Sequence, residues 1–258
     1  MAGEGDAFGE RLTSWRAYAD SPWSRLRYAV VAEALSRHLP SRPRPLRVLD
    51  VGGGDGRDSL PLALAGHEVT MVDPADAMVA EARRRAESAG AAAFTARVGS
   101  LDDLPAGTFD VVLCHFVLHY RPAGADDLSR LAAATTAGGI LSVTAPNPVG
   151  RVLQTLTRQG PDRALAELDA ESWESVTFQH AGRRVTAGEV AARLADLGLT
   201  VVGDYGGRIA NDLLVDDAAK ADPTFYRDLE RLELALFDRE PYRRIGIFWQ
   251  LVASKPSP

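Results

Sequence analysis

The sequence predicts an α/β fold in which a mostly parallel β-sheet is covered by helices on both faces. Three observations favour it. Apolar runs alternate with helix-like segments, a glycine-rich turn follows the first of these runs, and an acidic residue follows the second. Strands that are apolar along their whole length are typical of parallel sheets buried between two helical layers. At 258 residues, the chain is long enough for one such core with additional segments.

The elements are expected in a regular order. Residues 8–39 are predicted to form two helices, and the proline-rich stretch 40–45 ends them because no helix can cross it. Alternating apolar and helical patterns then predict strands and helices that continue to residue 145. The expected strands are 46–51, 68–72, 93–98, 109–116 and 139–145, and the expected helices are 56–65, 75–89 and 124–136. A helix at 187–197, a strand at 199–203, a helix at 223–239 and a strand at 246–253 complete the sheet.

These elements divide a single domain into four parts. They are an N-terminal helical cap (1–45), a ligand-binding core (46–146), a lid or acceptor segment (147–185) and a C-terminal part that completes the sheet (186–258). The third part follows Asn147-Pro148 and has no regular pattern, so we expect a small lid or substrate lobe there.

Composition and charge exclude several classes of protein. With 46% hydrophobic and 25% charged residues, the chain is typical of a globular domain. The N-terminus lacks the basic and apolar parts of a signal peptide, and no window approaches the about 18 apolar residues of a membrane span. We therefore expect a cytoplasmic protein without membrane contact. The net charge of −6 does not favour binding to a polyanion, and no pattern indicates an oligomeric state.

The glycine-rich turn is the strongest functional signal. The strand that ends at Val51 continues into Gly52-Gly53-Gly54-Asp55-Gly56, so bare backbone can approach a ligand where side chains would obstruct it. Dinucleotide sites use the spacing G-x-G-x-x-G and bind pyrophosphate at the helix N-terminus. Here Asp55 and Asp58 lie near the start of the next helix, and their carboxylates would repel a pyrophosphate. They would tolerate a ligand with an amino group and a sulfonium, such as S-adenosylmethionine, and an NAD-dependent dehydrogenase is the alternative.

The acid after the second apolar run supports the same conclusion. Asp73 follows Val69-Thr70-Met71-Val72, which puts it at the carboxyl end of the strand next to the glycine turn. A carboxylate at that position can accept hydrogen bonds from both ribose hydroxyls. Taken alone, Asp73 fits equally well as a cap for the helix that starts near Pro74.

These motifs resemble those of the class I S-adenosylmethionine-dependent methyltransferases. The match covers residues 46–146 and comprises the glycine motif, the ribose acid, the adenine-side loop 99–105 and the strand after it. The resemblance implies a Rossmann-like seven-stranded sheet with a reversed last strand, and S-adenosylmethionine as the cofactor. The residues it implies for cofactor binding are Asp50, Gly52, Gly53, Gly54, Asp73, Gly99, Ser100, Leu101 and His115. Many members have an acid at the position of Ser100, which is a departure.

A narrower resemblance spans most of the chain. Leu26-Arg27, the glycine motif, Gly66-His67, His115, Asn147, Gly207-Arg208 and Glu240-Pro241-Tyr242 are similar to the bacterial family that esterifies the carboxylate of 5-carboxymethoxyuridine in tRNA. The resemblance implies that Arg27 and His115 help to hold the cofactor, and a guanidinium is suited to its carboxylate. That family carries a lysine-rich run where this chain has the acidic stretch 168–174. Because RNA binding needs phosphate neutralisation, we expect a small-molecule acceptor and keep tRNA as the alternative.

The expected chemistry is an in-line displacement from an activated methyl donor, which needs alignment and exclusion of water more than acid or base. We expect methylation of a carboxylate or hydroxyl oxygen. A carboxylate needs no general base, whereas a hydroxyl would need one, and His119 and His180 are the candidates. No metal site is expected, because His115 and His119 have no third ligand at a sensible spacing. A cofactor-binding module without catalysis is the rival from another class.

Residues that contact the acceptor are expected after the strands or in the lobe above their carboxyl ends. Arg208 is expected to anchor a carboxylate, because it belongs to the narrower match and a guanidinium can bind a carboxylate through two hydrogen bonds. The expected acceptor-binding residues are Tyr120, Asn147, Arg151, Tyr205, Arg208 and Tyr242.

Overall fold

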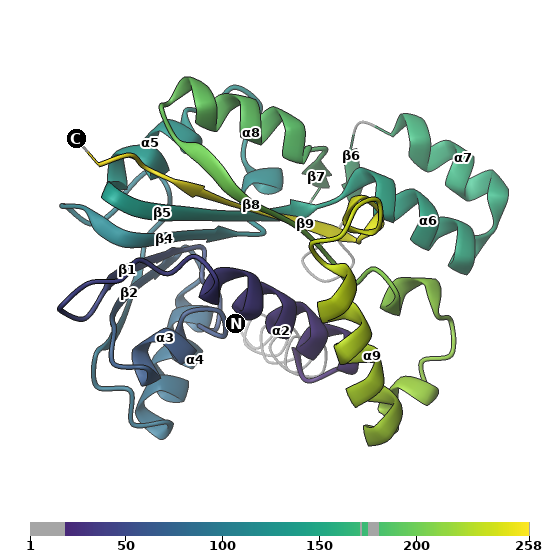
Figure 1. The fold of residues 1–258 in the computed structure, drawn as a ribbon, viewed down its shortest axis with the longest axis horizontal. Helices are drawn as coiled ribbons and strands as arrows, with labels where there is room; N and C mark the ends of the chain where they lie inside the picture. Colours follow the sequence, from purple (N-terminus) through teal and green to yellow (C-terminus); the bar gives the residue numbers. More distant parts are fainter. Residues whose placement is uncertain (1–18, 171, 175–180, 258) are drawn as a thin grey trace, which may run out of the picture.

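The computed structural model describes residues 19–170, 172–174 and 181–257. Its centre is a seven-stranded sheet with the strand order β3-β2-β1-β4-β5-β9-β8 (Figure 1). The strands are β1 (Arg47–Val51), β2 (Glu68–Asp73), β3 (Phe94–Val98), β4 (Phe109–His115), β5 (Thr135–Pro146), β8 (Thr200–Gly207) and β9 (Phe248–Ser254). β9 pairs antiparallel with both β5 and β8, and all other neighbours are parallel. The predicted α/β fold with a reversed last strand is confirmed.

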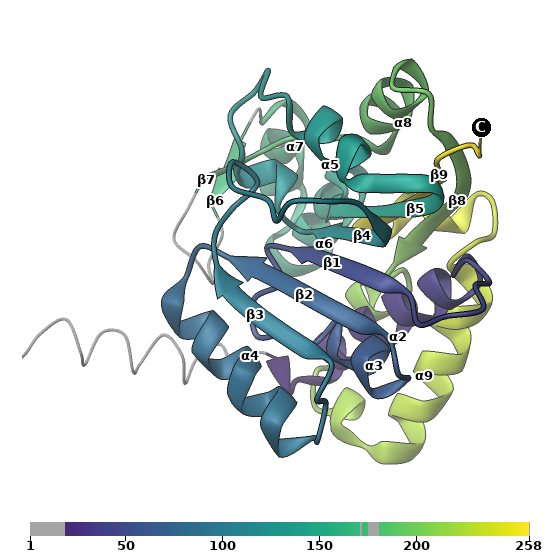
Figure 2. The ribbon, with the colours of Figure 1, turned by 90° about the vertical axis from the view of Figure 1, so that its left-hand side faces the viewer.

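Helices cover both faces of this sheet (Figures 1 and 2). α5 (Asp127–Ala134) and α8 (Ala187–Asp196) lie on one face, and α2 (Pro22–Ser36), α3 (Leu60–Leu64), α4 (Asp76–Ser88) and α9 (Pro223–Leu236) lie on the other. Alternate residues of a strand point to opposite faces, and both sets are buried. Val48 and Val111 belong to the apolar cluster that includes residues of α2 and α4, whereas Leu49 and Val112 belong to the cluster that includes residues of α5 and α8. This explains why the strands are apolar along their whole length.

Short polar signals fix the ends of several helices. Ser21 accepts a hydrogen bond from the amide of Ser24 at 3.3 Å, and a proline follows it in the first turn of α2. Thr186 and Glu189 form a reciprocal capping box at the start of α8. Asp222 accepts hydrogen bonds from two amides in the first turn of α9. These caps satisfy amides that have no partner within the helix.

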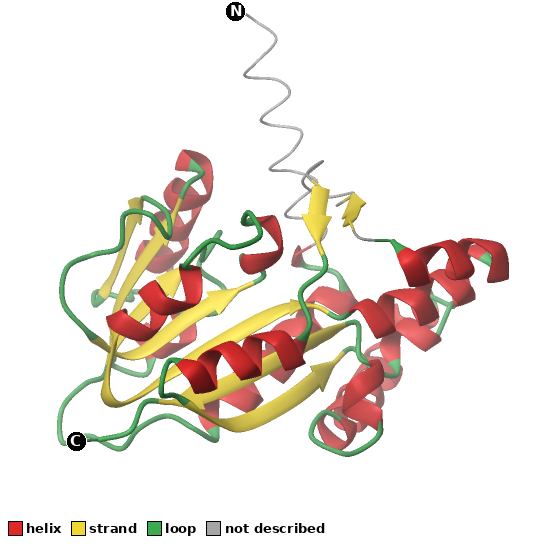
Figure 3. Ribbon diagram, turned by 90° about the horizontal axis from the view of Figure 1, so that it is seen from above, coloured by secondary structure: helices red, strands yellow, loops and turns green. Residues whose placement is uncertain are grey.

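Residues 147–185 contain more regular structure than expected. α6 (Pro148–Gln159) and α7 (Pro161–Asp169) are joined at Gly160, whose φ of 89° suits glycine, and β6 (Ser172–Glu174) pairs with β7 (Ala181–Arg183). Seen from above, the two helices lie at the right-hand end of the molecule, beyond the ends of the strands (Figure 3). His180 and most of the first expected N-terminal helix lie outside the described residues.

Several elements differ in length from the prediction, and two of these differences have a visible cause. The helix expected at 56–65 begins only at Leu60, because residues 52–59 form turns. β8 runs to Gly207 instead of ending at residue 203, because its glycines allow close packing. A Cβ on Gly206 would collide with the backbone of Arg243, and one on Gly207 would collide with the ring of Phe248.

The carboxyl ends of the parallel strands meet at one edge of the sheet, which we call the ligand edge. The loops after β1, β2, β3, β4, β5 and β8 all begin there, and such an edge is where open α/β sheets bind ligands. Four short helical turns lie among the loops: η1 (Leu118–Tyr120), η2 (Asn211–Leu213), η3 (Ala219–Ala221) and η4 (Tyr242–Ile245). Within the described ranges, no helix is long and apolar enough to cross a membrane.

Candidate functional site

The glycine turn at the ligand edge is shaped by backbone contacts. The amide of Gly52 donates to the carbonyl of Val72 in β2 at 2.8 Å, and the amide of Gly56 donates to the carbonyl of Gly53 at 2.9 Å. Gly52, Gly54 and Gly56 have φ values of 69°, 57° and 80°. Glycine adopts this region without the steric cost that a Cβ imposes. The turn therefore requires glycine at three positions for its backbone alone.

Gly53 and Gly54 differ in the space that surrounds them. A Cβ on Gly53 would collide with the side chains of Asp50 and Met71, so this residue is packed against the protein. A Cβ on Gly54 would meet no atom within 4 Å. The backbone of Gly54 consequently faces open space, where a ligand can approach it.

Asp73, at the end of β2, is tied to this turn. Its side chain is buried, and its two oxygens accept hydrogen bonds from the amides of Gly54 and Ala75, both at 2.9 Å. Burial raises the pKa of Asp73, and the two backbone hydrogen bonds oppose that effect. A carboxylate has about four acceptor positions, so it can still accept hydrogen bonds from a ligand. The helix-end contact and the expected ligand contact are therefore compatible.

The loop after β3 lies beside Asp73. The amide of Gly99 donates to the carbonyl of Asp73 at 3.1 Å, and Leu101 is buried in the core. The Ser100 hydroxyl accepts a hydrogen bond from the amide of Asp102 at 3.1 Å. The structure thus brings Gly99, Ser100 and Leu101 to the ligand edge next to the expected ribose acid.

A charged cluster links this loop to the loop after β4. Arg121 donates to both oxygens of Asp102 at 2.9 Å and to both oxygens of Asp127 at 3.0 Å. Arg130 also pairs with Asp102. Hydrogen bonds from Arg121 and Arg130 lower the pKa of Asp102 to about 2. The two loops are therefore held together on the adenine side of the expected site.

Arg27 and His115 meet at one carboxylate, that of Asp58. Arg27 on α2 donates to both oxygens of Asp58 at 2.7 Å, and Nδ1 of His115 lies 3.0 Å from Oδ2 of the same residue. Burial alone would raise the pKa of Asp58, but the guanidinium of Arg27 and the hydrogen bond from His115 hold it well below its usual range. The sequence pattern did not indicate this role for Asp58.

Asp50 lies beneath the glycine turn. It is fully buried and accepts a hydrogen bond from the Ser59 hydroxyl at 2.5 Å. Burial raises the pKa of Asp50 to about 6, and the nearby negative charge of Asp58 adds to this effect. The side chain of Asp50 therefore contacts Ser59, in the turn that follows the glycines.

The two acids near the start of the next helix, Asp55 and Asp58, are both paired with arginines. Asp55 is buried and bonds to Arg57 at 3.0 Å, with Arg85 at 3.9 Å, while Asp58 is held by Arg27. Neither carboxylate is an uncompensated negative charge. The expected repulsion of a pyrophosphate by these acids is therefore not supported, and the choice of cofactor depends on the glycine spacing and on Asp73.

His119 and Tyr120 lie in η1, directly after β4. The side chain of His119 is buried, and the two ring centroids are 4.0 Å apart. Burial lowers the pKa of His119 to about 3, and the positive charges of Arg183 and Arg151 contribute to the shift. The imidazole is therefore neutral at physiological pH and is a weak base there.

Two arginines of the acceptor segment approach this histidine. Nε of Arg183, on β7, donates to the carbonyl of Arg121 at 3.0 Å, immediately after η1. Arg151, on α6, bonds to Glu167 at 2.7 Å. The structure thus places the expected Arg151 near His119 and adds Arg183. The sequence signal for Arg183 was only its membership of an arginine pair.

Asn147 has a role in connecting elements. Its side chain is buried and donates to the carbonyls of Arg244 and Gly246, both at 2.8 Å, and it also caps α6. These contacts join the end of β5 to the loop before β9. The amide group is accordingly occupied by the backbone of the fold.

The structure does not bring the two expected tyrosines to His119. Tyr205 is in the core, with its hydroxyl 2.6 Å from Nε2 of His38 and its ring stacked on Phe237 at 5.0 Å. A register shift between Val201 and Gly203 affects which face the later residues of β8 reach. Tyr242 lies in η4 and is half exposed.

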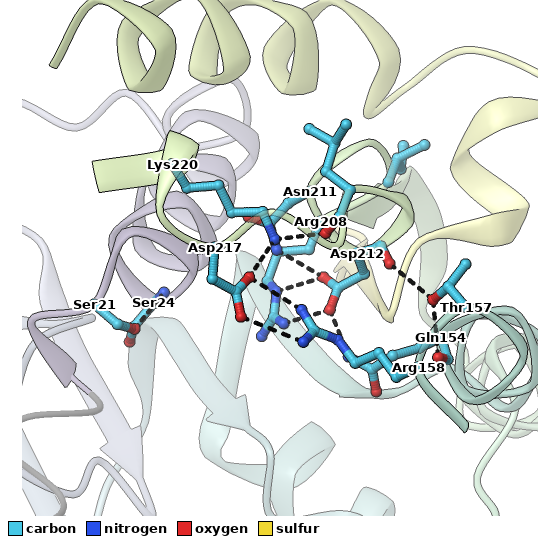
Figure 4. Close-up of polar contacts among 12 residues, drawn as sticks. Ser21, Ser24, Gln154, Thr157, Arg158, Arg208, Asn211, Asp212, Asp217 and Lys220 are labelled. Carbon is cyan, nitrogen blue, oxygen red and sulfur yellow. Dashed lines mark hydrogen bonds and ion pairs between the residues drawn. The ribbon is translucent and has the colours of Figure 1, made fainter. Parts of the chain in front are cut away.

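Arg208 belongs to a polar cluster between the loop after β8 and α6 (Figure 4). It has a φ of 55° and donates to both oxygens of Asp212 at 2.8 and 2.6 Å. The buried carboxylate of Glu233 accepts the amides of Ile209 and Asn211, both at 2.8 Å, and holds this unusual backbone in place. Gln154 and Thr157 of α6 also bond to Asp212.

Comparisons with known proteins identify the kind of domain. The family model described as "Methyltransferase domain" matches residues 48–139. The chain is 27% identical over 240 residues to the tRNA 5-carboxymethoxyuridine methyltransferase of Escherichia coli K12, covering 90% of this chain and 89% of that protein. It is 31% identical over 219 residues to a ubiquinone biosynthesis O-methyltransferase of Paramagnetospirillum magneticum, covering 76% of this chain and 84% of that protein.

A solved structure supports the fold. The magnesium protoporphyrin IX methyltransferase of Synechocystis PCC 6803 with bound SAH is similar with a TM-score of 0.61 and 20% identity, covering 96% of this chain and 94% of that chain. Within the described part of this chain, no group of three His, Cys, Asp or Glu side chains is arranged to hold a metal ion.

Proposed function

The chain belongs to the class I S-adenosylmethionine-dependent methyltransferases, and from this premise we propose that it methylates an oxygen of a small-molecule acceptor. The acceptor oxygen is that of a carboxylate or a hydroxyl group. S-adenosylmethionine is the cofactor. When bound, it supplies a methyl group that is already activated by the sulfonium charge.

The ligand edge fits this cofactor. We assign the turn from Gly52 to Gly54 to the close approach of the cofactor, because the backbone of Gly54 faces open space. Asp73 and the stretch from Gly99 to Leu101 are assigned to the ribose and adenine, with Arg27 and His115 on the other side of the turn. The chain must hold the donor, align the acceptor and exclude water, which together lower the barrier of an in-line displacement.

The observation that carries the choice of acceptor is the environment of His119. Its imidazole is buried and neutral, with a pKa lowered to about 3, and the positive charges of Arg183 and Arg151 are close by. Such a group is a poor base at neutral pH, and the positive charge of Arg183 favours a negatively charged acceptor, whereas that of Arg151 is offset by Glu167. A carboxylate meets both conditions, since it is nucleophilic without losing a proton. A hydroxyl acceptor would depend on the weak base His119.

We assign the acceptor side to residues after the strands and in the segment of α6 and α7. Tyr120 lies next to His119. Arg151 and Arg208 are our proposed anchors for an anionic group of the acceptor, which would have to compete with Glu167 and Asp212 for their guanidinium groups. Asn147 supports this side through its contacts with the loop before β9. Tyr205 is buried in the core against His38 and Phe237, so we give it no direct part in the reaction, and Tyr242 in η4 stays a proposed acceptor contact.

Carboxyl methylation of 5-carboxymethoxyuridine in tRNA is the second candidate. It is favoured by the 27% identity to the Escherichia coli enzyme, which extends over 90% of this chain. The acceptor segment argues against it, because α7 carries Asp162, Glu167 and Asp169 with Arg163 as its one basic residue. A segment with this charge neutralises few phosphates.

Transfer of a labelled methyl group tests the proposal. The purified chain is incubated with S-adenosylmethionine labelled in the methyl group and with a metabolite extract, and the product is fractionated by size. We expect label in the small-molecule fraction. Mild alkali distinguishes the two acceptors, because a methyl ester releases methanol and a methyl ether does not. Label on nitrogen, carbon or sulfur would contradict the proposal.

The rivals give different results in the same assay. Methylation of tRNA predicts label in the RNA fraction, and tRNA binding that weakens steeply with salt. A binding module without catalysis predicts cofactor binding by calorimetry and no transfer to any fraction.

A further inference from the structure

Asp58 connects three elements that surround the glycine turn. It lies between the glycines and α3, and it bonds to Arg27 of α2 and to His115 at the end of β4. The partners are 31 and 57 residues away in the sequence. One carboxylate therefore fixes the relative positions of two segments that we assign to the cofactor.

The chain of hydrogen bonds continues into the sheet. Nε2 of His115 lies 2.9 Å from the hydroxyl of Ser142 on β5, and Nε2 of Gln250 on β9 donates to the same hydroxyl at 3.0 Å. Because the Ser142 oxygen accepts from Gln250, its proton is available to Nε2 of His115. Nδ1 of the imidazole then carries the ring proton and donates to Asp58.

Asp58, His115 and Ser142 have the composition of a hydrolytic triad, but they cannot act as one. Ser142 and Gln250 are fully buried, so no substrate can reach the hydroxyl. These contacts instead restrain the His115 ring and favour the tautomer with the proton on Nδ1. The chain of hydrogen bonds extends from β9 through β5 and β4 to Asp58 and from there to α2.

The contacts of Asp58 also orient Arg27. Its guanidinium donates two parallel hydrogen bonds to one carboxylate and lies over the ring of Phe116 at 4.8 Å. A bidentate pair restricts an arginine far more than a single contact does. The side chain is 14% exposed, so a small part of it faces outward from this pair.

We propose that Asp58 is a positioning residue for cofactor binding, which presets Arg27 and His115 beside the glycine turn. The inference rests on the assignment of these two residues to the cofactor, and it does not depend on which acceptor the enzyme uses. Without the carboxylate, both side chains regain rotational freedom that cofactor binding must then remove. The loss would appear in affinity for the cofactor.

The test measures binding of S-adenosylhomocysteine by calorimetry to Asp58→Asn, with thermal unfolding to verify the fold. We expect affinity to fall by about tenfold or more, the effect of losing one charged hydrogen-bonding partner. The matched control is Asp110→Asn. Asp110 is also a buried carboxylate that bonds to an arginine, Arg44, but it lies at the opposite end of the sheet, and its variant is expected to bind as the wild type does.

A second readout needs no cofactor. Nitrogen-15 shifts of the His115 ring report its tautomer in the free protein, and we expect protonated Nδ1 in the wild type and a mixture in Asp58→Asn. If Asp58→Asn does not fold, Asp58→Glu, which keeps the charge and moves it by one methylene, is expected to fold and to weaken binding. Wild-type affinity in the folded variant, or an equal loss in Asp110→Asn, would overturn the proposal. Failure of the O-methylation proposal would appear only in the transfer assay.

Discussion

The carboxylate of Asp73 accepts a hydrogen bond from the amide of Gly54 at 2.9 Å, so the end of β2 and the glycine turn are held together. The same side chain binds the amide of Ala75. The residue that we assign to the ribose thus also shapes the turn. This double role determines which substitution tests it cleanly.

Asp73→Asn tests the ribose assignment with little disturbance of the turn. An amide keeps one oxygen for a backbone amide but loses the negative charge that would accept ribose hydroxyls. Because hydrogen bonds to charged groups contribute about 1.5–3 kcal/mol, we expect affinity for S-adenosylhomocysteine to fall by about 10- to 100-fold in calorimetry. Asp76→Asn, at the exposed start of α4, is the matched control and should leave affinity unchanged. Equal affinity in the Asp73 variant would show that the ribose lies elsewhere.

Two alanine substitutions in the glycine turn should both lower stability, but they should differ in their effect on cofactor affinity. Gly53→Ala inserts a methyl group against Asp50 and Met71, so it is expected to lower the free energy of unfolding by about 1–3 kcal/mol. Gly54→Ala meets open space and costs about 1–2 kcal/mol through its φ alone. Its methyl group would occupy the space next to the cofactor, so the larger effect is expected on affinity. Denaturant unfolding and calorimetry separate the two. Normal cofactor affinity in Gly54→Ala would show that this turn does not contact the cofactor.

The buried acid Asp50 should make stability depend on pH. Its pKa in the folded chain is about 6 against 3.8 ordinarily, so the folded state binds the proton more tightly. The resulting stabilisation is complete below about pH 4 and is lost as pH rises through about 6, a change of at most about 3 kcal/mol. Asp50→Asn lacks this titration. Between pH 4 and pH 7, urea unfolding should therefore show that the wild type loses stability relative to Asp50→Asn. A constant difference would contradict the raised pKa.

His119 should remain neutral over the physiological range. Its pKa is lowered to about 3 from 6.5, so proton binding to the unfolded chain destabilises the folded state as pH falls below 6.5. Titration of its ring signals by NMR is expected to show no protonation above about pH 4. Removing a neighbouring positive charge in Arg183→Gln should raise this pKa, whereas Arg184→Gln should change it less. A pKa near 6.5 for His119 in the wild type would contradict this prediction and would allow His119 to act as a general base.

Much of the fold was predictable because the strands are apolar throughout and the turns between them carry glycine. Predicted strand bounds from β1 to β4 differ from the observed ones by one residue at one end of each strand, and β5 starts four residues earlier than predicted, at Thr135. The helices of residues 147–169 were missed because apolar residues such as Leu156 and Leu165 are exposed, which leaves no clear buried stripe. β8 was cut short because Gly206 and Gly207 are typical of loops, yet here they allow close packing.

The candidate site was predictable where it follows the chain and not where it depends on tertiary contacts. The glycine turn, Asp73 and the loop from Gly99 follow strand ends, so topology alone brings them together. Asp58 meets Arg27 and His115 only through packing of α2 against the sheet. No local sequence pattern predicts such a contact. Tyr205 was expected at the acceptor because the strand was predicted to end at residue 203, whereas β8 continues to Gly207 and keeps Tyr205 within the sheet.

The central claim is that the ligand edge between β1, β2 and β4 binds S-adenosylmethionine and not a dinucleotide. Calorimetric titration of the wild-type chain with S-adenosylhomocysteine and, separately, with NAD tests it most directly. We predict saturable binding of S-adenosylhomocysteine at one site per chain and no binding of NAD. Binding of NAD without binding of S-adenosylhomocysteine would contradict the account.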